Sequence, residues 1–315
     1  MGKTQFVRVD KDSLKKIAQF QKELNQNSVI IGSYSLGIHV LKNKNNINEK
    51  FEFGKEESYE TLEKLSDLIG NILNEINRSK GKLTKNIKNS INDINEKLPA
   101  NWQSKDLNKN SLSLIKNELD ELKSDLKDYN KNLKTLKNSK EGDKIKDYIL
   151  DKLSDIDLIV EKPTDAAKKV KEHIWHKEGA LLHLNYYGMP VGFLLTSDEF
   201  TRIELDNYVE YELKEFGINS NGRIRVTTPE GFIGSKLFIN TLELKDYLNI
   251  GVALRLIANK KIPFNKELFI KLIKNSRGAS SPKRAYRIYL RILKIFNINK
   301  DPLDFKAVMK SLGIK

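Results

Sequence analysis

The stretch Ser154-Asp155-Ile156-Asp157-Leu158-Ile159-Val160 places two acidic residues directly before an apolar run. A β-strand repeats every two residues, so Asp155 and Asp157 are expected on the same face of a strand. Neighbouring carboxylates repel each other, and a cation bound between them relieves that repulsion. Mg²⁺ prefers hard oxygen ligands and often bridges carboxylates to substrate phosphates. The pattern predicts a Mg²⁺ or Mn²⁺ site, and the competing interpretation is a strand edge with two solvated acids.

A second stretch, Val29-Ile30-Ile31-Gly32-Ser33-Tyr34-Ser35-Leu36-Gly37, has an apolar segment that runs into Gly-Ser-x-Ser. It predicts a short strand, a tight turn and the start of a helix. Backbone N–H groups and hydroxyls at such a helix start can bind an anion, so Gly32, Ser33 and Ser35 are candidates to hold a triphosphate. The competing interpretation is an ordinary strand-to-helix turn in which a serine caps the helix.

Together these stretches resemble the nucleotidyltransferase superfamily, which includes DNA polymerase beta. The superfamily has an apolar strand, Gly-Ser and a helix, followed by a strand that carries Asp-x-Asp. A third stretch, Thr228-Pro229-Glu230-Gly231-Phe232-Ile233-Gly234-Ser235-Lys236-Leu237, is similar to the helix after the sheet in minimal and abortive-infection toxin-like nucleotidyltransferases. The resemblance covers residues 12–42, 150–200 and 225–260, and it implies that Lys236 faces the nucleotide phosphates.

The resemblance implies a metal-dependent enzyme that transfers NMP from an NTP to an acceptor. RNA, tRNA-like, is the expected acceptor, and a toxin or defence role is one form of this activity. A hairpin is expected over residues 180–196, and its second strand carries a third carboxylate in the family. Gly192 stands there in this chain. Gly192→Asp is therefore expected to raise activity, and the alternative function is a catalytically impaired nucleic-acid-binding or scaffold module.

Residues 55–150 interrupt this pattern with apolar residues spaced three and four apart, which is a heptad seam. The seam predicts an inserted antiparallel coiled-coil hairpin with arms of about 40 residues, roughly 60 Å each. A dimerisation coiled coil is the competing interpretation, so a homodimer or a protein partner is possible through this arm. The segment holds nineteen basic and seventeen acidic residues, so it is not an obvious nucleic-acid binder. The seam residues are Leu62, Leu65, Ile69, Ile72, Ile76, Leu83, Ile87, Ile91, Ile94, Leu98, Ile115, Leu119, Leu122, Leu126, Tyr129, Leu133 and Leu136.

Basic charge is concentrated at the end of the chain. Residues 251–315 hold sixteen basic and three acidic residues, a net +13 of the total +14. One predicted helix there forms a strip with two tyrosines, Tyr286 and Tyr289, between its cations. Such a strip can bind phosphates and stack on unpaired bases; alternatively it is a solvated face with the tyrosines in the core. The strip consists of Lys283, Arg284, Arg287, Arg291 and Lys294.

Composition and periodicity complete the expectations. The 315 residues contain no Cys and no apolar run of membrane-spanning length, and no signal peptide is evident, so a cytoplasmic protein without a membrane partner is expected. Helices are expected from Asp10 to Asn25 and from Thr164 to Glu178. The expected fold is α+β: a nucleotidyltransferase-like mixed sheet from residues 1–54 and 151–228, the inserted hairpin 55–150, and a basic helical domain 229–315.

Overall fold

The computed structural model describes residues 8–53, 59–79, 82–98, 107, 111–140, 142–151, 156–178, 181–194, 198–238, 243–275 and 282–312. The chain divides into two compact units. One comprises Met1–Phe51 with Gly142–Lys315, and the other is Glu52–Glu141. Among the described residues, no helix is long and apolar enough to cross a membrane.

A seven-stranded mixed sheet forms the first unit together with helices, as the expected α+β class requires. The strand order is β3-β4-β5-β2-β1-β7-β6. The central strand β1 runs antiparallel to β2 and parallel to β7, while β2 runs parallel to β5. The strands are β1 (Ser28–Ile31), β2 (Ile156–Val160), β3 (Ile174–Glu178), β4 (Leu181–Tyr186), β5 (Met189–Leu194), β6 (Tyr208–Glu212) and β7 (Arg223–Thr227).

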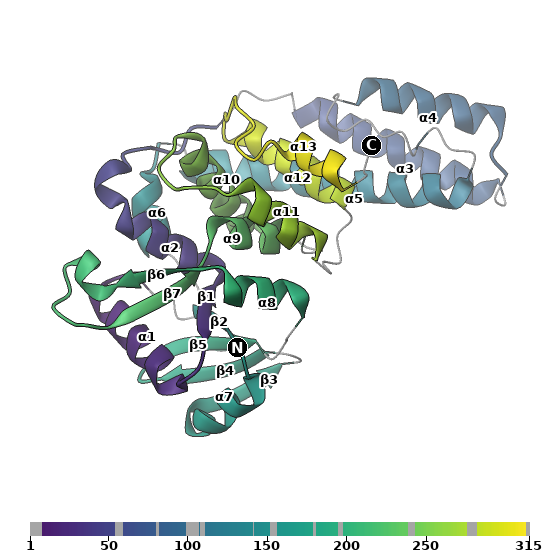
Figure 1. Ribbon diagram of the computed structural model, residues 1–315. Helices are drawn as coiled ribbons and strands as arrows, with labels where there is room; N and C mark the ends of the chain where they lie inside the picture. Colours follow the sequence, from purple (N-terminus) through teal and green to yellow (C-terminus); the bar gives the residue numbers. More distant parts are fainter. Residues whose placement is uncertain are drawn as a thin grey trace. The chain divides into compact units, whose positions relative to one another are not determined.

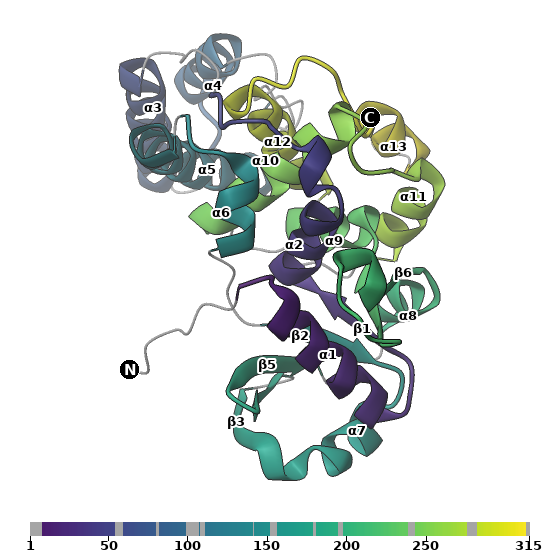
Figure 2. The ribbon, with the colours of Figure 1, turned by 90° about the vertical axis from the view of Figure 1, so that its left-hand side faces the viewer.

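Helix α1 (Lys11–Leu24) covers one face of the sheet (Figure 2). It begins where Asp10 accepts a hydrogen bond from the Ser13 backbone N–H, 2.9 Å, and the Ser13 hydroxyl accepts one from the Asp10 N–H, 3.0 Å. This reciprocal pair satisfies two N–H groups that the helix start leaves unpaired. The expected helix is confirmed, and its cap lies at Asp10. Its apolar stripe is fully buried: Leu14, Ile17, Phe20 and Leu24.

The opposite face carries a smaller apolar cluster, in which Val29 of β1 and Ile159 of β2 pack with Leu205 of α8 (Glu199–Asp206). Asp198 caps α8 by accepting a hydrogen bond from the Thr201 N–H, 2.8 Å. This carboxylate therefore supports the helix start.

The helices after β7 belong to the same compact unit as the sheet, and Figure 1 shows them gathered beyond one end of it. Helix α9 packs against α2, and α10 packs against α2, α9 and α12. The expected boundary at residue 229 between the sheet domain and a basic helical domain stays a prediction. The remaining helices of this unit are α2 (Gly32–Lys42), α6 (Ile145–Asp151), α7 (Pro163–Lys169), α9 (Pro229–Leu237), α10 (Leu244–Ala258), α11 (Lys266–Lys274), α12 (Pro282–Ile295) and α13 (Phe305–Ser311), with short 3-10 helices at Lys44–Asn46, Lys171–His173 and Leu213–Phe216.

The described part of the second unit holds three helices, so the expected division into two arms of about 40 residues is wrong. They are α3 (Tyr59–Arg78), α4 (Lys85–Lys97) and α5 (Leu112–Lys140), and α3 packs against both others. Thr84 starts α4 by accepting a hydrogen bond from the Ile87 N–H, 3.2 Å, which separates α4 from α3. The seam positions whose side chains are described are buried apart from the half-buried Leu83. Leu62, Tyr129 and Leu133 lie outside the described side chains.

Candidate functional site

Strand β1 runs into helix α2 without an intervening turn, because Gly32 is the first helical residue. Gly32 has φ +68°, a left-handed conformation that residues with a Cβ rarely adopt. A Cβ at this position would also lie only 3.3 Å from Asp157 Oδ2. The glycine therefore allows the carboxylate to approach the start of α2, where unpaired N–H groups favour negative charge.

Asp157 is half-buried on β2, directly opposite Ile31 of β1 on one side and Gly192 of β5 on the other. A Cβ added at Gly192 would collide with Asp157 Oδ1, so the carboxylate occupies the space above this glycine. Gly192→Asp cannot add a third carboxylate here without displacing Asp157. The effect of the substitution on activity stays a prediction, and it requires the Asp157 side chain to move.

The metal site is described only in part, because Asp155 lies outside the described residues. In the described part of the chain, no three His, Cys, Asp or Glu side chains are grouped so that they could hold a metal ion. Asp157 supplies a carboxylate at the mouth of α2, which is the hard oxygen chemistry that Mg²⁺ prefers. Asp157 is therefore suited to be one ligand of such an ion.

The two candidate serines face different surroundings. Ser35 is fully buried, and its hydroxyl donates a hydrogen bond to the Gly32 carbonyl, 2.7 Å away inside the first turn of α2. Ser33 is 8% exposed and its hydroxyl accepts a hydrogen bond from Asn249 Nδ2 of α10, 2.7 Å. A hydroxyl that accepts one bond can still donate its own proton. Ser33 is therefore the serine that can contact a ligand, and Ser35 stabilises the helix start.

Lys236 of α9 forms an ion pair with Asp246 of α10, with 2.8 Å between Nζ and Oδ1. The Asp246 side chain is only 4% exposed, and its other oxygen accepts from the Glu243 N–H at 3.1 Å. Burial, together with the charge of Asp246, raises the pKa of Tyr148 on α6 to about 12. Lys236 thus neutralises a carboxylate of the protein itself.

Helix α10 links these groups, because Asp246 and Asn249 are three residues apart and share one helix face. The first contacts Lys236 and the second contacts Ser33, so α10 supplies a polar partner to each of these two predicted residues. Sequence reasoning missed Asn249. Its signal was a buried polar residue three positions after Asp246 in an otherwise apolar helix.

Strand β3, which replaces the end of an expected helix, begins a row of side chains that crosses the sheet next to Asp157. The expected helix 164–178 is wrong, since α7 ends at Lys169 and β3 takes residues 174–178. On β3, His176 lies opposite His183 of β4, and the two rings stack with centroids 5.7 Å apart. His183 lies opposite Gly192, which lies opposite Asp157. Strand register creates this row, and spacing along the chain gave no signal for it.

Thr227, at the end of β7, joins two buried titratable side chains. Its carbonyl accepts a hydrogen bond from His39 Nε2, 2.9 Å, and its hydroxyl donates to Glu204 Oε1, 2.6 Å. The assignment of the proton to Nε2 follows from its carbonyl partner. Burial lowers the pKa of His39 and raises the pKa of Glu204 to about 7. His39 is therefore expected to stay neutral above its ordinary pKa of 6.5, and Glu204 to be mostly protonated below pH 7.

The predicted basic strip of α12 does not lie on the surface as a whole. Arg287 and Arg291 are only 6% and 1% exposed. Arg284 is half-buried and Lys294 is exposed, while the side chain of Lys283 lies outside the described ones.

The tyrosines of α12 also serve the core. The Tyr286 ring stacks on Phe305 with centroids 5.6 Å apart, and the Tyr289 ring stacks on the same residue at 4.8 Å. The Tyr289 hydroxyl donates a hydrogen bond to Asp301. The two tyrosines therefore pack in the core, as the competing interpretation expected, and nucleic-acid binding by the cations of α12 stays a prediction.

Comparison with known proteins adds no relative. A scan against protein-family models gives no match to this chain, and a search of curated proteins finds none that is similar.

Proposed function

We propose that this chain is a metal-dependent nucleotidyltransferase that transfers NMP from an NTP to an acceptor, with RNA as the expected acceptor. The observation that carries the proposal is the approach of Asp157 to Gly32 at the start of α2. A carboxylate beside a helix start places a metal-binding oxygen next to N–H groups suited to phosphate. Phosphoryl and nucleotidyl transfer depend mostly on such positioning and charge neutralisation.

The residues take distinct roles in this proposal. Asp157, together with Asp155, would hold Mg²⁺ or Mn²⁺, and the bound ion would supply charge neutralisation for the phosphates. Gly32 lets the Asp157 carboxylate approach the start of α2, and the Ser33 hydroxyl can donate to a phosphate oxygen while Asn249 orients it. Lys236 supports the site through Asp246 and Asn249, so it acts as a positioning residue.

A second candidate function is a nucleic-acid-binding or scaffold module without catalysis. It is favoured by the space above Gly192, which the carboxylate of Asp157 fills and which the nucleotidyltransferase family fills with a third carboxylate. The metal that activates the acceptor hydroxyl would then be poorly held. Slow or absent transfer with retained RNA binding is the behaviour that this candidate requires.

The test combines the two aspartates of the proposed metal site. The wild-type protein and Asp155→Ala/Asp157→Ala are incubated with each labelled NTP, Mg²⁺ or Mn²⁺, and total RNA. The proposal expects metal-dependent labelling of RNA by the wild type and at least a hundredfold loss in the variant. Calorimetry of ATP binding with and without Mg²⁺ should show a metal-dependent affinity that the variant lacks.

A matched control is Asp165→Ala, which removes an exposed carboxylate from α7 that lies 3.7 Å from Lys168. It should retain full labelling. Equal ATP affinity in the wild type and the double variant, with and without Mg²⁺, would remove the metal site from the proposal. RNA binding without any transfer would favour the non-catalytic candidate.

A further inference from the structure

A pocket of about 670 Å³ lies between α1 and the segment that enters β7. We call it the α1–β7 pocket. Four of its lining residues are basic, and none of the described residues that line it is acidic: Lys15, Lys22, Arg223 and Arg225. Pockets of this volume accommodate ligands of about nucleotide size. Its lining therefore favours an anion.

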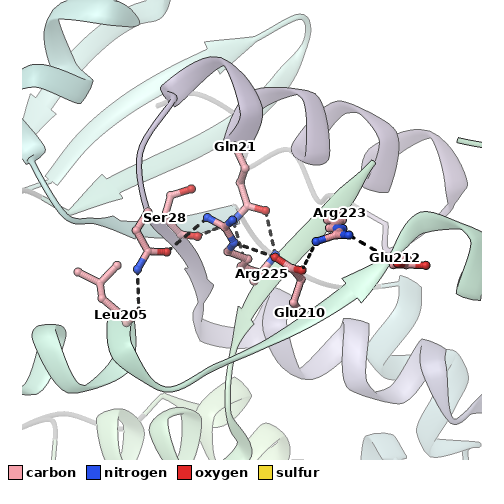
Figure 3. A network of polar contacts seen from close by, with 8 residues as sticks. Gln21, Ser28, Leu205, Glu210, Glu212, Arg223 and Arg225 are labelled. Atoms are coloured by element: carbon pink, nitrogen blue, oxygen red, sulfur yellow. Dashed lines mark hydrogen bonds and ion pairs between the residues drawn. The ribbon is translucent and has the colours of Figure 1, made fainter. Parts of the chain in front are cut away.

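Gln21 fixes the walls of this pocket relative to each other. It is 8% exposed on α1, and its Nε2 donates to the carbonyls of Ser28, 2.9 Å, and Arg225, 3.1 Å. Its Oε1 accepts from the Arg225 N–H at 3.0 Å. Figure 3 shows the side chain reaching from α1 to the backbone of β7. A site whose walls are held before binding avoids part of the ordering cost of binding.

The two arginines are held by a carboxylate behind them. Glu210 of β6 accepts from Arg223 Nη1 at 3.1 Å and from Arg225 Nε at 3.0 Å, and it lies between them in Figure 3. The guanidinium of Arg225 also lies 5.4 Å from the centroid of the Tyr208 ring. A guanidinium has five N–H donors. Within the described part of the chain, Arg225 Nη2 has no hydrogen-bond partner and can bind an oxyanion.

The two lysines complete the lining from α1. Lys15 and Lys22 are seven residues apart, so they lie on the same face of the helix. Both are exposed, and neither forms an ion pair within the described part of the chain. Glu210, together with Glu212 at 3.9 Å from Arg223, offsets the charge of the two guanidinium groups, so the two ammonium groups leave the lining with a net positive charge that a multivalent anion can neutralise.

We propose that the α1–β7 pocket binds a ligand with two or more phosphate groups, of about the size of one nucleotide. The phosphates can belong to a free nucleotide or to the backbone of a nucleic acid. The pocket is separate from the candidate site at Gly32. Strands β1 and β7 run parallel, and Ser28 and Arg223 are their first residues, whereas Gly32 and Thr228 follow their ends. The proposal does not depend on transferase activity.

The test is calorimetry in EDTA at about 50 mM salt, where surface charges are incompletely screened. The probes are ATP, inorganic triphosphate and a twelve-nucleotide oligouridylate. EDTA removes metal-dependent binding at Asp157 from the measurement. The wild type is compared with Lys15→Gln/Lys22→Gln. The matched control is Lys16→Gln/Lys168→Gln, which loses the same two charges from exposed lysines that do not line the pocket.

The pocket variant should bind at least tenfold more weakly than the wild type, and the control should stay within about twofold. Binding of ATP and triphosphate at one site per chain identifies a free nucleotide as the source of the phosphates. Binding of the oligonucleotide alone, lost in the same variant, identifies the nucleic-acid backbone. The proposal is overturned if no probe binds the wild type, or if both double variants lose affinity equally.

Discussion

The two ends of the parallel pair β1 and β7 use charge in opposite ways. Where the strands end, the polar groups pair with each other: Lys236 with Asp246, and Ser33 with Asn249. Where the strands begin, Lys15 and Lys22 are exposed in the lining of the α1–β7 pocket. The two arginines of the same lining, Arg223 and Arg225, donate hydrogen bonds to Glu210. Internal pairing at the first end should appear as stability, and exposed charge at the second should appear as ligand affinity.

The largest expected effect comes from breaking the buried pair. Asp246→Ala leaves the Lys236 ammonium without its carboxylate and removes the acceptor for the Glu243 N–H at the start of α10. Breaking a buried ion pair costs about 3–5 kcal/mol, and the partial exposure of Lys236 places the expected loss near 3 kcal/mol. Urea denaturation followed by circular dichroism measures it.

The double variant Asp246→Ala/Lys236→Met serves as the control for this prediction. It removes both charges, so it should be more stable than Asp246→Ala alone. If Asp246→Ala unfolds at the wild-type urea concentration, the pair contributes nothing to the fold, and the contrast between the two ends fails.

The second-largest effect is a change of stability with pH that comes from Glu204, the carboxyl group bound by the Thr227 hydroxyl. The pKa of Glu204 is raised to about 7 in the folded protein, above its ordinary value of 4.5. Its contribution to stability is therefore complete below pH 4.5 and is lost as the pH rises through 7. The full shift corresponds to about 3 kcal/mol, and local relaxation reduces the expected effect to about 2 kcal/mol. Glu204→Gln should be more stable than the wild type at pH 8 by this amount, measured by thermal unfolding.

His39 acts in the opposite direction, because burial lowers its pKa. Its contribution is present above its ordinary value near 6.5 and is lost as the pH falls below it. Glu204→Gln should therefore leave a protein whose stability only rises between pH 5 and pH 8. Parallel pH profiles for the variant and the wild type would show that Glu204 does not titrate in this range.

Sequence periodicity predicted the elements that depend on local spacing. The stripe of α1 repeats every three or four residues, and the hairpin of β4 and β5 turns at Tyr187-Gly188 as expected. The break between α3 and α4 was missed because an apolar repeat continues across it. The strand at 174–178 was missed because it follows a short helix whose polar pattern resembles its own.

The candidate site needed tertiary information. Gly32 and Asp157 were both predicted as site residues, but only strand pairing determines that the carboxylate fills the space above Gly192. The same holds for charge. The run of cations in α12 predicted a surface strip, yet Arg291 lies on the buried side of the helix. The α1–β7 pocket could not be predicted from a run of cations, because its basic residues come from two distant segments of the chain.

A third prediction concerns the residue that fixes the pocket walls. Gln21→Leu keeps the volume of the side chain but removes its three hydrogen bonds to Ser28 and Arg225. Buried backbone groups that lose a partner cost about 1–3 kcal/mol in total, so a loss of about 1.5 kcal/mol is expected. The variant should also bind the phosphate probes more weakly. Unchanged stability and unchanged affinity together would show that the hydrogen bonds of Gln21 do not hold the walls of the α1–β7 pocket in place.

The smallest effect is expected where charge is exposed. Lys15→Gln/Lys22→Gln removes two ammonium groups that form no ion pair in the described part of the chain, so the free energy of unfolding should change by less than about 0.5 kcal/mol. Loss of the net positive charge of the pocket lining makes a slight gain the expected sign at low salt, and added salt should abolish it. Urea denaturation at two salt concentrations measures both. A loss above 1 kcal/mol would mean that these lysines support the fold, as Lys236 does at the other end of the strands. A loss of phosphate binding would then no longer assign them to a ligand site.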